Sequence, residues 1–194
     1  FLAGSRLGSE EDWIQFRHQV TTLVLATDMS LHFESLSKFQ TQMVTKLDKG
    51  CARIEVLGND KGMEMAIQMA LKTADIGHCA MRLGSHIYWV AKLEVEFFRQ
   101  GDLERKAGHP ISPLMDREKT GTTHPSNQVG FFDVIVLPLY SAFVQAFPEA
   151  SPLLDQLDIN YSYWKHCTAK PDYAPPILDD LHWRIMEAFE SSGQ

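Results

Sequence analysis

One carboxylate stands at the C-terminal end of a predicted helix face that is otherwise apolar. Asp75 closes this helix and is followed by Ile76, Gly77 and His78. A carboxylate on an apolar helix face is expensive to bury unless a cation accompanies it. Two interpretations follow: Asp75 caps a helix or joins a salt bridge, or it ligates a metal ion. Under both interpretations we expect a cation near this side chain.

A second pair of residues has the chemistry of a base-binding site. Gln128 and Phe131 are three residues apart, so they share one face if their segment is helical. A buried glutamine amide can donate and accept hydrogen bonds, which suits the edge of a purine. An aromatic ring one turn along can stack on the face of the same purine. The alternative is a surface glutamine beside a core phenylalanine.

Three groups of motifs, in this order and at these separations, resemble one known family. They are Leu23–His32, then Ala74–His78 with Glu96–Asp102, then Ile111–Pro113 with Asn127–Asp133. Over roughly residues 13–165, the chain resembles the catalytic domain of the eukaryotic class I cyclic-nucleotide phosphodiesterases. Each motif alone is weak, whereas their combination is specific.

The resemblance assigns roles to the residues that match the family's motifs. It implies that Asp75 ligates the catalytic metal, and that Thr27 and Asp28 lie behind the metal ligands in the catalytic centre. Substrate contacts are implied for the purine-selecting glutamine, the two jaws of a hydrophobic clamp, a pocket-lining ring, a variable histidine and a methionine directed toward the substrate: Gln128, Phe131, Leu93, Phe97, His78 and Met29. From residue type alone, His78 is also compatible with a solvated histidine, Asp28 with a helix cap, and Leu93 and Phe97 with an ordinary core.

The activity implied by the resemblance is hydrolysis of cAMP, cGMP or both to the 5'-monophosphate. The family uses a hydroxide activated by two divalent metal ions, Zn²⁺ with Mg²⁺ or Mn²⁺. The H-N-x-x-H segment and the H-D pair that supply most metal ligands do not occur in this sequence. We therefore expect the remaining ligands outside this chain segment, and favour a fragment over a relative that has lost catalysis. The alternative function is a catalytically inactive module that binds cyclic nucleotides or a helical partner.

Apolar residues recur every three or four positions along most of the chain, which predicts helices. The pattern predicts a buried stripe from Trp13 to Val24, a helix that Gly101 ends, and a helix that Pro138 interrupts. The predicted helices cover 13–26, 35–47, 60–75, 86–100, 129–147, 152–164 and 177–189, and a long loop covers 108–127. The predicted fold is all-α, a compact multi-helix array, and the resemblance makes it a partial HD-type phosphodiesterase domain. Residues 1–170 would belong to that domain, and residues 171–194 would form a C-terminal helical extension.

The composition excludes some classes of function. The net charge of −7 and the absence of a basic cluster argue against a nucleic-acid partner. Three widely spaced cysteines and no signal-peptide pattern predict a cytoplasmic protein, and the apolar stretch at 134–139 is too short to span a membrane. The expected partner is the cyclic nucleotide, with a homodimer as an assembly that the sequence permits. His78 and His86 differ from the residues of most cAMP-selective relatives, which favours broader or dual substrate use.

Overall fold

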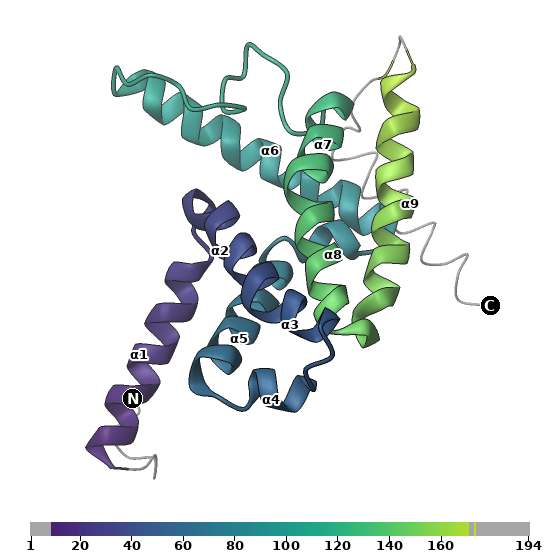
Figure 1. Ribbon diagram of the computed structural model, residues 1–194. Helices are drawn as coiled ribbons and strands as arrows, with labels where there is room; N and C mark the ends of the chain where they lie inside the picture. Colours follow the sequence, from purple (N-terminus) through teal and green to yellow (C-terminus); the bar gives the residue numbers. More distant parts are fainter. Residues whose placement is uncertain (1–8, 171–172, 174–194) are drawn as a thin grey trace, which may run out of the picture. The chain divides into compact units, whose positions relative to one another are not determined.

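The computed structural model describes residues 9–170 and residue 173 (Figure 1). These residues form helices and connecting turns, with no strand in the described part of the chain, which confirms the all-α prediction. They gather into two compact units that meet in sequence between Asp75 and Ile76. The predicted helix 177–189 lies outside the described residues, and the division at residue 170 stays a prediction.

The first unit begins with a helix whose start is fixed by local chemistry. Ser9 caps it: the Ser9 hydroxyl accepts from the Asp12 N–H, while the Asp12 carboxylate accepts from the Ser9 N–H at 2.7 Å. The predicted helix at 60–75 is present with the same bounds. The elements of this unit are α1 (Glu10–Ala26), η1 (Met29–Leu31), α2 (His32–Phe39), η2 (Gln40–Val44), α3 (Thr45–Asp48), α4 (Arg53–Leu57) and α5 (Asp60–Asp75).

The predicted buried stripe on α1 is wrong. No residue of α1 is buried, and Phe16 and Val24 are 49% and 61% exposed. Helix α1 packs along α5, but a single neighbouring helix covers only part of its circumference. Between the two helices a cavity of about 280 Å³ remains, lined partly by Leu23 and Met63. Periodicity therefore identified the helix correctly but not the burial of its apolar face.

The second unit is built around one apolar core. Its elements are η3 (Gly77–Ala80), α6 (Leu83–Lys106), α7 (Pro125–Phe131), η4 (Phe132–Val136), α8 (Leu137–Ala146), η5 (Pro148–Ala150) and α9 (Ser151–Thr168). Helix α9 packs against α7 and α8, and also contacts α6 and η3. The buried residues of the core come from η3, α6, η4, α8 and α9: Cys79, Ile87, Val90, Ala91, Phe132, Val136, Tyr140, Leu157 and Trp164.

The segment Pro125–Ala146 is helical throughout, and Pro138 does not break it. A wider π-helical turn, Phe132–Val136, directly precedes Leu137 and Pro138. Because proline lacks an N–H and its ring crowds the preceding turn, a π turn is a fitting way to continue the helix. The combined helix is long and apolar enough to cross a membrane by length and composition. Phe132, Val136 and Tyr140 of this helix are buried in the apolar core of the second unit.

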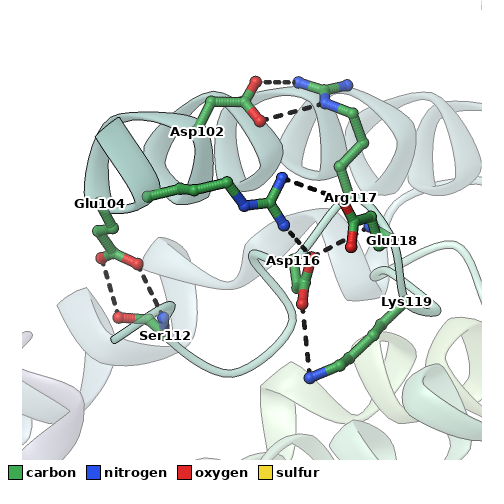
Figure 2. Close-up of polar contacts among 8 residues, drawn as sticks. Asp102, Glu104, Ser112, Asp116, Arg117, Glu118 and Lys119 are labelled. Atoms are coloured by element: carbon green, nitrogen blue, oxygen red, sulfur yellow. Dashed lines mark hydrogen bonds and ion pairs between the residues drawn. The ribbon is translucent and has the colours of Figure 1, made fainter. Parts of the chain in front are cut away.

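The loop between α6 and α7 is held against α6 by carboxylates (Figure 2). The Glu104 carboxylate accepts from the Ser112 N–H at 2.7 Å and from its hydroxyl at 2.9 Å. Arg117 donates to Asp102 through two nitrogens, at 2.6 and 3.4 Å. A second group of ion pairs joins Arg105 to Asp116 and Glu118, and Lys119 to Asp116. The predicted long loop is therefore present and well anchored.

Gly101 does not end its helix, contrary to the prediction. Helix α6 continues for five residues beyond it, to Lys106. A Cβ at position 101 would collide with the backbone carbonyl of Met115 in the loop. Glycine is thus required here because a loop backbone lies directly against the helix, and not because the helix needs a terminating residue.

We expect Gly101→Ala to lower the free energy of unfolding by about 1–3 kcal/mol, because the methyl group forces the loop away from α6. Limited proteolysis within residues 108–124 should accelerate in this variant. Gly130→Ala is the matched control: it lies in α7 with no atom near the added methyl group. That change should leave stability unchanged or raise it by up to about 1 kcal/mol. Equal stabilities of the two variants in urea denaturation would contradict the role of Gly101.

Two histidines and a tryptophan form a hydrogen-bonded chain inside the second unit. The indole N–H of Trp164 donates to Nε2 of His86 at 2.7 Å, and Nδ1 of His86 lies 3.2 Å from Nδ1 of His78. Indole can only donate, so Nε2 of His86 must carry a lone pair. In the neutral ring the proton is then on Nδ1 and is donated to His78. Burial, reinforced by His78, lowers the pKa of His86 to about 3.

This pKa predicts acid sensitivity. Between the unfolded value of 6.5 and about 3, the unfolded chain binds a proton that folded His86 does not, so stability should fall as the pH drops below about 6.5. His86→Gln cannot titrate and still offers an acceptor to Trp164, so its melting temperature should fall less steeply between pH 6.5 and 4.5. His166→Gln removes an exposed histidine of α9. Its melting temperature, measured by circular dichroism, should fall with pH as steeply as that of the wild type. Identical slopes for all three proteins would refute the assignment.

Candidate functional site

Asp75 is the last residue of α5 and is exposed. Within the described part of the chain its carboxylate accepts no hydrogen bond, and its electrostatic neighbour is Lys72, one turn earlier on the same helix. Lys72 is thus a cation near Asp75, and the carboxylate itself is exposed at the end of the helix. Exposed carboxylate oxygens suit Mg²⁺, Mn²⁺ and Zn²⁺. The Asp75 carboxylate fits a metal ligand.

Thr27, Asp28 and Met29 form the turn that leaves α1. The Thr27 hydroxyl donates to the Val24 carbonyl at 2.8 Å, which closes the last turn of the helix. Asp28 caps η1: its carboxylate accepts from the Ser30 N–H at 2.8 Å, and the hydrogen bonds from Ser30 hold the pKa of Asp28 below its usual value. The alternative interpretation of Asp28 as a helix cap is confirmed. Met29 is 43% exposed, and the predicted roles of all three in catalysis or binding stay predictions.

Gln128 is buried on α7, and its amide has one fixed orientation. One amide group lies 2.8 Å from the backbone carbonyl of Thr122. A carbonyl only accepts, so the group that faces it must be Nε2. The other end, Oε1, is buried and has no hydrogen-bond partner among the described residues. An orphaned buried acceptor is costly unless a ligand or water supplies a donor.

The carbonyl that fixes Gln128 is itself held in place. The hydroxyl of Thr122 donates to the Val90 carbonyl on α6 at 3.2 Å. The next residue, Thr123, donates through its N–H and its hydroxyl to the Glu94 carboxylate, each at 2.8 Å. Two successive loop residues are thus anchored to α6. The amide orientation of Gln128 is therefore set by a rigid part of the loop.

The remaining predicted substrate residues also lie in the second unit. Phe131 is on the same helix as Gln128, one turn along, and packs against the apolar core. Leu93 and Phe97 are half-buried on α6, one turn apart from each other. His78 is half-buried on η3 and is bound to His86. The predicted residues thus fall into two sets, one at helix ends of the first unit and one in the second unit.

One group of possible metal donors occurs in the second unit, made of His78, Cys79 and His86. Their ligand atoms all lie within 4.8 Å of one another. The hydrogen bond from Trp164 keeps the proton of His86 on Nδ1, the atom that would have to bind the metal. Burial also raises the pKa of the Cys79 thiol to about 12, so this sulfur is protonated at neutral pH. The group is satisfied as a hydrogen-bonded chain and does not fit a metal centre.

Sequence reasoning missed two residues that hold predicted site residues in place, one in each unit. Thr122 fixes the Gln128 amide through its backbone carbonyl, for which no side-chain pattern exists. Lys72 is buried, with 2% of its surface exposed, in a helix that was recognised. A charged residue one turn before Asp75 was the available signal for Lys72.

Comparison with known proteins identifies the family. Residues 5–157 match the family model for 3',5'-cyclic nucleotide phosphodiesterases. The chain is 38% identical over 149 residues to the dual specificity calcium/calmodulin-dependent 3',5'-cyclic nucleotide phosphodiesterase 1C of Mus musculus, an alignment of 76% of this chain and 19% of that protein. It is 33% identical over 174 residues to the probable 3',5'-cyclic-AMP phosphodiesterase pde-4 of Caenorhabditis elegans, covering 89% and 25% of the two chains.

A third relative is also a cyclic-nucleotide phosphodiesterase that this chain matches over part of its length. The 3',5'-cyclic-AMP phosphodiesterase isoform F of Drosophila melanogaster is 35% identical over 161 residues, which cover 82% of this chain and 24% of that protein. The aligned part is thus about a fifth to a quarter of each relative's length. The match to the family model covers most of this chain and includes the motifs around Asp75 and Gln128. The chain therefore belongs to the 3',5'-cyclic nucleotide phosphodiesterase family.

Proposed function

We propose that this chain provides the base-binding part and one metal ligand of an enzyme that hydrolyses a 3',5'-cyclic nucleotide to its 5'-monophosphate. The observation that carries the proposal is the buried amide of Gln128, with Nε2 bound to the loop and Oε1 left without a described partner. A purine edge would supply the missing donor. Phe131 lies one turn along α7 from Gln128, and its ring would stack on that purine.

The fixed amide leads us to propose cAMP as the preferred substrate. If the exocyclic group of the purine faces Oε1, the 6-amino group of adenine donates to it, whereas the 6-keto group of guanine would place a second acceptor there. An unsatisfied pair of this kind costs about 1–3 kcal/mol, which corresponds to roughly tenfold or more in kcat/KM. This proposal replaces the dual substrate use that His78 and His86 favoured at the level of sequence.

Asp75 is the residue of this chain that we assign to the metal centre, because its exposed carboxylate has free oxygen donors. Two divalent ions, Zn²⁺ with Mg²⁺ or Mn²⁺, would supply an activated water and neutralise charge on the phosphoryl oxygens when bound. The role of this chain is then to ligate through Asp75 and to orient the nucleotide through Gln128 and Phe131, so that the phosphate is presented in a reactive geometry. A cytoplasmic location and a homodimer remain part of the proposal.

The first test is hydrolysis and metal content in the longest polypeptide that the gene encodes. We expect the wild type to convert cAMP to 5'-AMP, and Asp75→Asn to lower kcat by a factor of about 100 or more. Bound zinc and manganese, measured by mass spectrometry, should fall in parallel. Asp60→Asn, at the other end of α5, should leave both unchanged. Binding of cAMP without hydrolysis by the wild type would favour the inactive binding module instead.

The second test addresses the amide orientation. We expect a kcat/KM ratio of cAMP to cGMP of about ten or more. The ratio should be closer to one in Thr122→Val, which removes the hydroxyl that ties Thr122 to the Val90 carbonyl and so frees the loop that orients Gln128. Gln128→Ala should lower kcat/KM for cAMP without changing metal content. Thr168→Val makes the same chemical change at an exposed position of α9 and should keep the wild-type ratio. Equal use of both nucleotides by the wild type would contradict the fixed-amide proposal.

A further inference from the structure

Lys72 is a buried cation in the first unit. Only 2% of its surface is exposed, and it shares its helix face with the buried residues Ala66, Met69 and Thr73. Removing an ammonium group from water is expensive unless acceptors replace the water. Burial accordingly lowers the pKa of Lys72, while the carboxylates of Asp75 and Asp28 act in the opposite direction. Hydrogen-bond acceptors in the protein must therefore replace the water that the Lys72 ammonium group loses.

Those acceptors are two backbone carbonyls on either side of Thr27. The ammonium group donates to the carbonyl of Ala26 at 3.2 Å and to that of Asp28 at 3.3 Å. Ala26 is the last residue of α1, where the helix dipole leaves partial negative charge, and a cation is favourable at such an end. Lys72 thus fixes the backbone of the Thr27–Met29 turn from a helix more than 40 residues away in sequence.

The same side chain lies next to the proposed metal ligand. Lys72 is three residues before Asp75 on α5, so the two side chains lie on one face of the helix. Asp75 and Asp28 both interact electrostatically with the Lys72 ammonium. The turn and the carboxylate are therefore connected through one buried residue.

We propose that Lys72 is a positioning residue, which holds the Thr27–Met29 turn against the end of α5 and thereby sets the affinity of the Asp75 site for divalent metal. This inference rests on the proposed function, because it assumes that Asp75 ligates metal. It adds a residue that does not touch the substrate and acts through the placement of the turn.

The decisive variant is Lys72→Met, which keeps most of the length of the side chain and removes its donors. If Lys72 positions the turn, the dissociation constants of zinc and manganese should rise by about tenfold or more, the range seen when partners behind metal ligands are removed. The melting temperature in EDTA should change by only a few degrees, because methionine also relieves the burial of a charge. Metal affinity is measured by competition with a chromophoric chelator in the longest polypeptide encoded by the gene.

Three further variants separate the outcomes. Lys38→Met removes an exposed lysine of α2 that pairs with Glu34, and it should bind metal like the wild type. Lys72→Gln keeps one donor and should show an intermediate loss; it decides the question if Lys72→Met does not fold. Asp75→Asn tests the proposed metal site alone.

The results distinguish the two proposals. If Asp75→Asn loses metal while folded Lys72→Met and Lys72→Gln bind it with wild-type affinity, the positioning role is wrong and the metal site stands. If Asp75→Asn also retains wild-type affinity, the metal site itself is wrong. A fall in melting temperature without a change in metal affinity would show that Lys72 is only structural.

Discussion

Turns between helices leave backbone carbonyls and N–H groups outside the helical hydrogen-bond ladders, and where they are buried they need partners from elsewhere. In this chain, side chains from distant helices supply them. The amide of Asn160 on α9 donates to the carbonyls of Cys79 and Met81 at 2.7 and 2.8 Å. Lys72 does the same at the end of α1, and Glu94 accepts from the loop before α7. The path of each of these three connections is thus fixed by a polar side chain from another helix.

The candidate site residues lie at or beside these turns. Thr27, Asp28 and Met29 form the turn that Lys72 holds, and Gln128 is bound to the loop that Glu94 and Thr122 anchor. Residues in helix connections do not have to follow the helical spacing. Their geometry depends instead on the side chains that anchor the connection. Replacing an anchor should therefore displace the candidate site residues even though the anchor itself would not contact the substrate.

The sequence was sufficient for the elements whose apolar residues repeat regularly. The helix at 60–75 was predicted with its observed bounds. Prediction was wrong where a residue's role depends on a partner far away in sequence. Gly101 resembles a helix terminator, but the loop backbone at Met115 explains it better, and nothing local indicates that contact. Lys72 was passed over for the same reason, since its acceptors are carbonyls of residues 26 and 28.

The same limit applies to purine selectivity. Judged by side-chain identity, His78 and His86 favour broader or dual substrate use. In the structure, both ring nitrogens of His86 are already committed, one to Trp164 and one to His78. Neither is left to orient the glutamine, and the group that does so is a backbone carbonyl, which every residue type carries. The amide orientation therefore depends on how the loop before α7 is anchored. Two relatives with different side chains at positions 78 and 86 could share one orientation, and two relatives with the same side chains there could differ.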